Sequence, residues 1–264
     1  ENASHGRVMV ELFLVWFLVF VRAGAMLFIF PIFAAAAMPV RLRLAIAGFL
    51  AVLTIPGVML PPEVIEFTLF QFVLLVGKEV FVGLMLGFVV RLIMFSVALA
   101  GHYIGTEMGL QLASLIAPGE TDPSPTPSAI LSLLAVMLMF ALDVHFELLM
   151  GFQQSYGVLP IGGGQISGPL FNAVTAMCAH TFVVAVRIAA PVIAVGIVVS
   201  LLLMVLAKTI PQINVFIESF SVRILVGVFL FGFTISMAAQ QITEYLHKLP
   251  EDFVVATRLM GLGG

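Results

Sequence analysis

Residues 188–207 have the sequence IAAPVIAVGIVVSLLLMVLA, a run of 20 residues that contains no charged side chain. Because an α-helix rises 1.5 Å per residue, this run would be about 30 Å long, which matches the hydrocarbon core of a bilayer. Arg187 precedes the run and Lys208 follows it. The stretch therefore predicts a helix that can span a membrane.

The composition of the whole chain points the same way. Its 264 residues are 62% hydrophobic and only 9% charged, with a mean hydropathy of +1.21. Soluble domains are about half apolar and about a quarter charged, and a soluble fold of this length cannot hide so much apolar surface. We expect lipid, other subunits or both to cover it. The net charge of -3 is spread in single residues, which argues against a nucleic-acid partner.

Prolines, glycines and charges divide the chain into about six apolar segments, which predicts an all-α, polytopic membrane-assembly protein. The third segment is too long for one crossing of about 20 residues, so we expect it to fold into two helices. The six segments are residues 8–33, 44–60, 64–117, 128–156, 170–208 and 213–249.

A Pro-rich stretch at residues 118–127, PGETDPSPTP, interrupts the middle of the chain. Its four prolines predict a loop. We therefore expect one membrane domain over residues 1–264. It comprises first helical hairpins at 1–117, the Pro-rich loop at 118–127, later hairpins at 128–249 and a C-terminal tail at 250–264.

Charged residues recur inside the apolar segments. A charge at the bilayer centre is costly, so each should face a partner, a water-filled cavity or another subunit. An ion or proton pathway is one interpretation; we favour helices packed against other subunits, or side chains that reach the membrane surface. Adjacent Lys78 and Glu79 point to different faces of a helix, so each needs a partner elsewhere. The set is Arg22, Lys78, Glu79, Arg91, Arg187, Glu218 and Arg223.

Glycines recur at four-residue spacing, first at Gly83 and Gly87 and then at Gly101, Gly105 and Gly109. Such ladders let helix backbones approach closely. They serve either packing within the chain or contact with another subunit.

Signatures of enzymes are missing. His145 with Glu147 lacks the second histidine of a helical zinc motif, and residues 164–168 do not have the spacing of a nucleophile elbow. Asp143 and Glu147 share a helix face and could hold a cation, although a polar helix end explains them equally well. We expect no catalysis, no cofactor and no metal site.

The segment before the Pro-rich loop, residues 105–117, is apolar and contains two glycines. If it lines a cavity, it could form a pliable hydrophobic plug, because Met and Leu side chains adapt and exclude water. On the residues alone, a helix end docked on its neighbours is the simpler interpretation.

Several motifs, taken in order, resemble the FliR family (SctT-like), the export-gate membrane subunit of bacterial flagella and related type III secretion systems. The resemblance extends from Arg22 to about Gly227. The matching positions are Arg22, Pro31, 39–45, 83–88, 100–109 up to Pro118, His145, Ser155, 159–162, 190–191 and 211–216.

The resemblance implies one copy of the chain in a helical assembly with several FliP-like and FliQ-like subunits. It also implies an FlhB-like subunit at the entrance, a flagellar basal-body ring in the bacterial inner membrane, and unfolded export substrates. The helices would form bent hairpins that partly lie outside the bilayer. The segment before the loop would then plug and gate the pore, through Gly105, Met108, Gly109, Leu110, Leu112, Leu115, Ile116 and Pro118.

The resemblance and the interior charges together predict a set of residues that pack against other subunits. An ion-coupled secondary transporter or channel subunit built on Arg91, Arg187 and Glu218 is the alternative function, and a hydrolase using His145 and Ser167 comes third. No internal repeat supports a transporter. The predicted packing residues are Arg22, Pro39, Arg41, Lys78, Glu79, Gly83, Gly87, Arg91, Gly101, Pro191, Pro211, Gln212, Phe216, Glu218 and Arg223.

Overall fold

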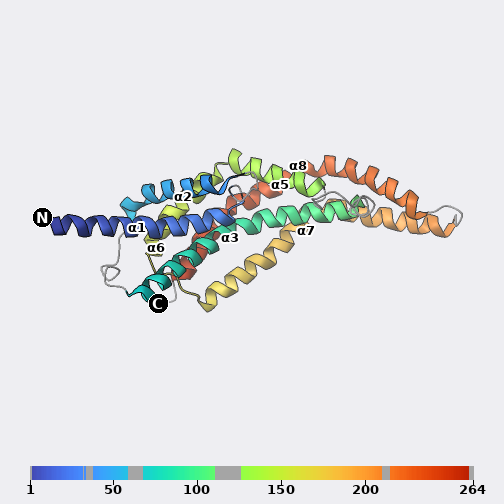
Figure 1. Cartoon of the computed structure of the whole chain (residues 1–264). Helices are drawn as coiled ribbons and strands as arrows, with labels where there is room; N and C mark the ends of the chain where they lie inside the picture. The colour runs from blue at the N-terminus through green and yellow to red at the C-terminus, as the bar shows by residue number, and fades with distance from the viewer. Residues whose placement is uncertain are drawn as a thin grey trace. The chain divides into compact units, whose positions relative to one another are not determined.

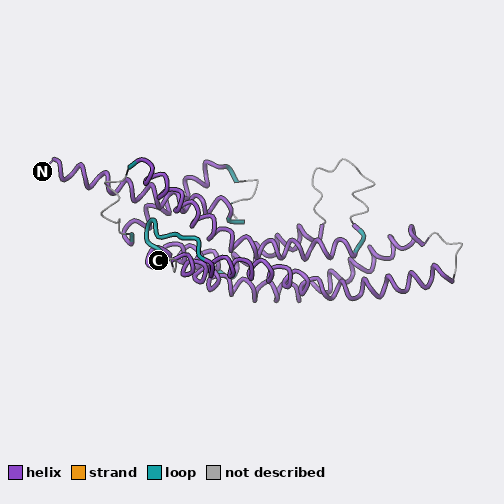
Figure 2. The backbone as a smooth tube through the Cα atoms, turned by 90° about the horizontal axis from the view of Figure 1, so that it is seen from below, coloured by secondary structure: helices purple, strands orange, loops and turns teal. Residues whose placement is uncertain are grey.

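The computed structural model describes residues 2–31, 33, 38–58, 68–110, 126–209 and 215–261, with side chains except at 2–8 and 215–218. Within these ranges the chain is helical, with short turns between helices (Figure 2). The helices, labelled in Figure 1, are α1 (Asn2–Ile29), α2 (Val40–Thr54), η1 (Ile55–Gly57), α3 (Leu69–Glu107), α5 (Thr126–Ala141), α6 (Val144–Val158), α7 (Gly168–Thr209) and α8 (Val215–Gly261).

Five of these helices are long and apolar enough to cross a membrane: α1, α2 with η1, α3, α7 and α8. The pair α5 and α6 would be a sixth, broken span, bent by 68° between Ala141 and Val144. Asp143 sits in this break with a positive φ of 57°. The prediction of an all-helical protein with several membrane spans is confirmed.

Only part of the predicted third segment, residues 64–117, is described: α3 covers Leu69–Glu107, a turn follows, and residues 111–117 lie outside the described residues, so the prediction of two helices stays a prediction. α3 is one helix of 39 residues, about 58 Å long. Its sequence contains no proline, so nothing removes a backbone hydrogen bond from its interior. A membrane thickness limits the part of a helix that lies in lipid, and α3 is free to extend beyond it.

Three boundaries differ from expectation. The predicted segment 128–156 is two helices, because the chain breaks at Leu142 and Asp143. Thr126 and Pro127, expected in the Pro-rich loop, begin α5, since proline suits the first turn of a helix. The predicted tail continues α8 through Pro250 to Gly261. Residues 118–125 of the predicted loop lie outside the described residues.

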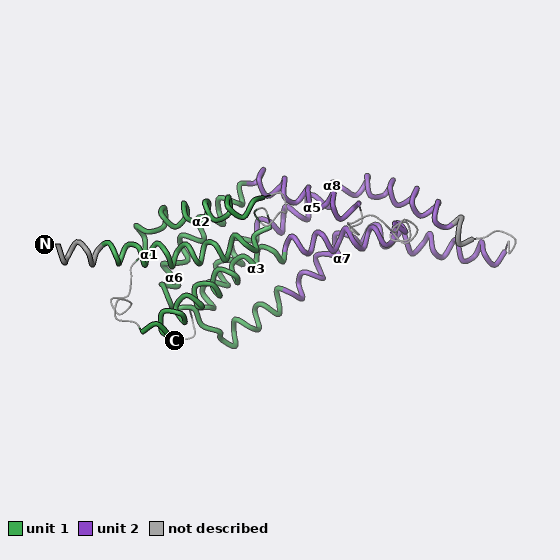
Figure 3. The backbone as a smooth tube through the Cα atoms, viewed as in Figure 1, with its two compact units in different colours: residues 1–92, 143–177, 248–264 green, residues 93–142, 178–247 purple. Residues whose placement is uncertain are grey.

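Unit 1 comprises Glu1–Leu92, Asp143–Met177 and Lys248–Gly264, coloured green in Figure 3. Here α1 packs against α2, where the Trp16 indole donates a 3.4 Å hydrogen bond to the carbonyl oxygen of Gly48. At the start of α7, the Ser167 hydroxyl accepts a hydrogen bond from the Leu170 amide and donates one to the Leu259 carbonyl oxygen of α8. Ser167 therefore caps α7 and joins it to the end of the chain.

Unit 2 comprises Ile93–Leu142 and Cys178–His247, purple in Figure 3. In it α3 meets the start of α5 so closely that a Cβ at Gly101 would overlap the backbone of Ser128. The Ser128 hydroxyl donates a 2.9 Å hydrogen bond to the Ala98 carbonyl oxygen. Sections of α7 and α8 complete the unit and surround the end of α3.

Candidate functional site

The candidate site lies in unit 2, where α3 ends. Met108 still donates a helical hydrogen bond to the Ile104 carbonyl oxygen, at 3.0 Å, but Gly109 has a positive φ of 74°. Its amide donates to the Thr106 carbonyl oxygen, also at 3.0 Å. A glycine in this conformation commonly stops a helix, because it alone adopts it without a steric penalty. Gly109 therefore turns the chain out of α3.

Two glycines make room for the last side chains of α3. A Cβ at Gly196 of α7 would overlap the carboxylate of Glu107, and a Cβ at Gly227 of α8 would overlap the side chain of Met108. A Cβ at Gly109 would in turn lie 3.6 Å from the Phe220 ring of α8. The end of α3 thus occupies a seat formed by two other helices. We call Glu107, Met108 and Gly109 the α3 terminus.

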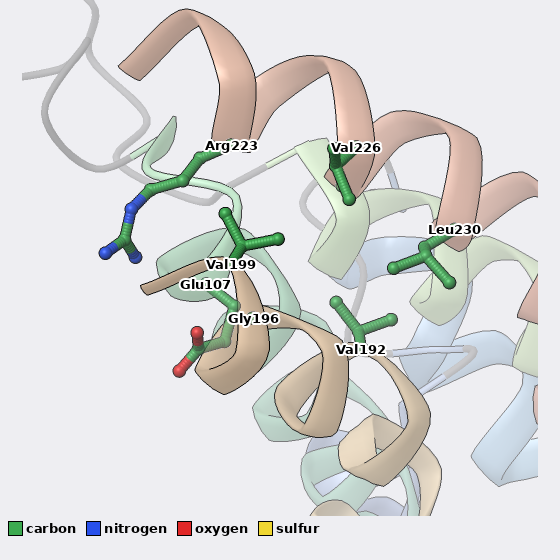
Figure 4. Close-up of a pocket in the computed structure, with 8 residues that line it drawn as sticks. Glu107, Val192, Gly196, Val199, Arg223, Val226 and Leu230 are labelled. Carbon is green, nitrogen blue, oxygen red and sulfur yellow. The ribbon is translucent and has the colours of Figure 1, made fainter. Parts of the chain in front are cut away.

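A small pocket beside the α3 terminus has one charged side and one apolar side. Glu107 and Arg223 are directed to the same side, with Val199 drawn between them, and Val192, Val226 and Leu230 line the other (Figure 4). The Arg223 guanidinium donates a 3.0 Å hydrogen bond to the Ser200 hydroxyl, which donates to the Gly196 carbonyl oxygen at 2.7 Å. Within the part of the chain that the structure describes, neither a hydrogen bond nor an ion pair reaches the Glu107 carboxylate.

A second charge cluster lies in unit 1 and has the opposite character. Arg22 of α1 and Glu79 of α3 are both fully buried. The guanidinium meets the carboxylate through two hydrogen bonds, Nε to Oε2 at 2.6 Å and Nη2 to Oε1 at 3.1 Å. Its Nη1 donates to the Ser155 hydroxyl at 3.3 Å and to the Leu159 carbonyl oxygen at 3.2 Å. Buried ion pairs are tolerated when their remaining polar atoms are satisfied in this way.

The same cluster fixes the turn that follows α6. The Gly162 amide donates to Glu79 Oε1 at 2.9 Å, and Lys78 Nζ donates to the Gly162 carbonyl oxygen at 3.1 Å. The Arg22 guanidinium carbon also lies 3.9 Å from the centre of the Tyr156 ring, a cation–π contact. Three separate stretches of the chain therefore depend on one ion pair.

The glycine ladder at Gly83 and Gly87 serves packing within the chain. A Cβ at Gly83 would overlap the Arg22 carbonyl oxygen and lie 2.8 Å from the Ala25 side chain; one at Gly87 would lie 2.7 Å from the Met26 carbonyl oxygen. α1 therefore packs directly on the backbone of α3. This close approach is what brings Arg22 within reach of Glu79.

Half of the predicted plug residues lie in the described part of the chain. Gly105 is buried inside regular α3, and the chain turns at Gly109. Met108 and Gly109 are buried and Leu110 is half-buried. Leu112, Leu115, Ile116 and Pro118 lie outside the described residues.

The predicted packing residues are in several different environments. Arg22 and Glu79 are paired with each other inside the chain, so the expectation that they face other subunits is wrong; the register of α1 on α3 supplies their partners. Gly83, Gly87 and Gly101 are buried at contacts between helices, and Pro191 and Arg223 are half-buried. Pro39, Arg41, Lys78 and Arg91 are exposed. Pro211 and Gln212, with the side chains of Phe216 and Glu218, lie outside the described residues.

Among the residues of the alternative functions, the structure describes the surroundings of Arg91, Arg187 and Ser167. Arg91 is an exposed residue of unit 1, whereas Arg187 belongs to unit 2 and donates a 3.3 Å hydrogen bond to the Tyr245 hydroxyl. Ser167 caps α7. Among the described residues, no group of three His, Cys, Asp or Glu side chains could hold a metal ion.

The sequence did not predict that Glu107, Gly196, Ser200 and Gly227 belong to one site. Glu107 is a charge inside an apolar segment and satisfied the criterion that selected the other seven. Gly196 and Gly227 interrupt the bulky apolar residues of α7 and α8, a signal of close approach to another element. What sequence lacks is the pairing of these helices.

The chain matches the family model described as "Bacterial export proteins, family 1" over residues 13–249. It is 30% identical to the flagellar biosynthetic protein FliR of Bacillus subtilis, over 83% of this chain and 85% of that protein. It is 29% identical to FliR of Caulobacter vibrioides, over 89% and 94% of the two chains. Yop proteins translocation protein T of Yersinia pestis is 28% identical over 70% and 71%. The chain therefore belongs to the FliR/SctT family of bacterial export proteins, which are multi-span membrane proteins and not enzymes.

Proposed function

We propose that this chain is a structural and gating subunit of the flagellar type III protein export channel. The chain would help to close a helical pore, and the segment that follows Gly109 would plug the pore until a substrate passes. The substrates would be unfolded polypeptides.

The observation that supports gating best is the seat of the α3 terminus. Met108 occupies the space that Gly227 leaves free, and Gly109 turns the chain out of the helix at a defined point. The segment that begins at Leu110 is thus anchored at its base. Its sequence is apolar apart from one Gln and one Ser up to residue 117, which suits a dry contact that excludes water and ions.

Membership of the family supports a proposal about the partners. We expect the subunit to assemble with FliP-like and FliQ-like subunits and an FlhB-like subunit, in the bacterial inner membrane at the flagellar basal body. Large apolar side chains are exposed on α7 and α8, among them Leu202, Phe229 and Phe233. Lipid or neighbouring subunits must cover such a surface.

The assembly is tested by native mass spectrometry of the tagged chain, co-expressed with its genomic neighbours and extracted in mild detergent. A discrete complex with one copy of this chain and several copies of two smaller membrane proteins is expected. A stable monomer or homodimer without partners would contradict the export-gate assignment.

The plug is tested by replacing residues 110–116 in the assembled complex with Gly and Ser at the same length. Ion leakage across the membrane should increase, because polar, flexible residues no longer form a dry barrier. The matched control replaces the polar residues 119–122 of the same connection in the same way and should leave leakage low. Equal leakage from the two variants would argue against a plug at 110–116.

A further inference from the structure

The carboxylate of Glu107 and the guanidinium of Arg223 both contact α7, at positions one helical turn apart. Glu107 lies against Gly196, and Arg223 donates its hydrogen bond to Ser200, four residues further along the same face. One turn of helix is about 5.4 Å. Two opposite charges therefore lie close together on one side of the pocket without being paired.

This arrangement leaves an obvious alternative partner for each group. Glu107 is half-buried, and the described residues offer its carboxylate no hydrogen bond in the present arrangement. A carboxylate next to an apolar wall gains more from a guanidinium than that guanidinium gains from a neutral hydroxyl. The long side chain of arginine can move between the two by rotation about its own bonds, with no change in the helices.

We propose that Arg223 is a two-position latch for the α3 terminus. In the open position, which the structure shows, the guanidinium binds the Ser200 hydroxyl, and within the described residues no ion pair joins the α3 terminus to α8. In the closed position the guanidinium leaves Ser200 and pairs with Glu107, which ties the last residue of α3 to α8. If residues 110–116 form the plug proposed above, the latch sets how firmly the base of that plug is held.

The latch makes Ser200 its adjustable element. The Ser200 hydroxyl competes with the Glu107 carboxylate for one guanidinium, so removing the hydroxyl should favour the closed position. Removing either charge abolishes the closed position, whereas exchanging the two charges should preserve it. These three consequences distinguish a latch from two neighbouring charges that do not interact.

The test is backbone hydrogen exchange, followed by mass spectrometry, of residues 104–110 in the full chain within its membrane complex. In the membrane complex we expect the closed position to predominate, so Glu107→Gln and Arg223→Gln should each speed exchange about threefold to tenfold, and the double variant no more than either single one. The charge-swapped variant, Glu107→Arg with Arg223→Glu, should return the hydrogen-exchange rate to within about twofold of that of the unmodified protein. Ser200→Ala should slow exchange. Arg187→Gln, which removes another hydrogen-bonded arginine of unit 2, is the matched control and should leave residues 104–110 unchanged.

The latch would be overturned if the two single variants had additive effects, or if the charge-swapped double variant showed faster hydrogen exchange than both single variants. Faster exchange in Ser200→Ala would overturn it too. Ion leakage measured on the same variants separates the latch from the plug. Coupled exchange with unchanged leakage supports the latch and shows that it does not control leakage, whereas altered leakage with uncoupled exchange contradicts the latch alone.

Discussion

The two arginine–glutamate sites of this chain use the same residue types in opposite ways. Arg22 and Glu79 are fully buried, joined by two hydrogen bonds and surrounded by further polar partners. Arg223 and Glu107 are half-buried, and no ion pair joins them in the described residues. In the first site, within unit 1, the two charges are paired. In the second, within unit 2, the Glu107 carboxylate has no hydrogen bond or ion pair among the described residues.

The two sites differ in which atoms occupy the space beside the neighbouring glycine. Gly83 admits the backbone of α1, whose carbonyl oxygen and Ala25 side chain occupy the free space. At Gly196 the nearest atoms belong to the Glu107 side chain, with its carboxylate in the closest contact. A backbone held this closely leaves a buried charge one arrangement, whereas a flexible side chain keeps several. The Arg22–Glu79 pair of unit 1 therefore has one arrangement, whereas the Glu107 side chain of unit 2 keeps several.

The largest effect is expected from breaking the complete pair. Glu79→Ala leaves the buried Arg22 without its carboxylate and should lower the free energy of unfolding by about 3–5 kcal/mol. Arg223→Ala, at the incomplete site, should cost only about 1 kcal/mol. Denaturant titration of the full chain in detergent, followed by circular dichroism, measures both.

A combined variant tests whether this loss of stability comes from a buried charge without its partner. Arg22→Met with Glu79→Leu removes both charges and should recover most of the stability lost in Glu79→Ala. Equal losses from Glu79→Ala and Arg223→Ala would show that the two sites do not differ as described.

The next largest effect concerns the close approach that creates the complete pair. Gly83→Ala places a Cβ on the Arg22 carbonyl oxygen, so a helix backbone must shift, at a cost of about 1–3 kcal/mol. Gly77→Ala is the matched control in the same helix, because no atom lies within 4 Å of its new Cβ; it should add up to about 1 kcal/mol through helix propensity. If both variants were equally stable, α1 could not be packed on α3 at Gly83.

These positions also show how far sequence alone could lead. The apolar runs predicted helices that span a membrane, and the spacing of Gly83 and Gly87 predicted a close helix contact. The partner of Arg22 lies 57 residues away in the chain. Only the register of α1 against α3 determines that pairing, so local spacing led us to expect partners in other subunits.

The candidate site was predictable in part for a similar reason. Gly109 was predicted as part of the plug segment, and its positive φ shows that the chain turns there. Gly105 has the same residue type and an equally apolar context, yet it lies within regular α3. The helical hydrogen bonds of α3 continue to its end, which lies where Gly196 and Gly227 leave space for the last side chains of that helix. Sequence could not show that these two glycines face the same helix end.

A smaller effect is expected from the turn that ends α3. Gly109→Ala forces a side chain into the left-handed conformation and should cost about 1–2 kcal/mol of local stability. Gly109→Asn should cost less, because asparagine tolerates this conformation better. Hydrogen exchange of residues 104–110 in the membrane complex measures the loss, and an Ala variant slower than the Asn variant would contradict the turn geometry.

The smallest effect, and the sharpest contrast with Gly83, is expected at Gly196. Gly196→Ala also places a Cβ on another group, but that group is the carboxylate of Glu107, the free end of a flexible side chain. The carboxylate can move into the pocket beside it, so the steric cost should nearly offset the gain of up to about 1 kcal/mol in helix propensity. The net change in unfolding free energy should therefore be within about 0.5 kcal/mol. In a Glu107→Ala background the obstacle is gone, and Gly196→Ala should become stabilising by up to about 1 kcal/mol. If Gly196→Ala instead costs as much as Gly83→Ala in both backgrounds, α7 and the α3 terminus must be in rigid backbone contact. The proposed freedom of Glu107 would then be wrong.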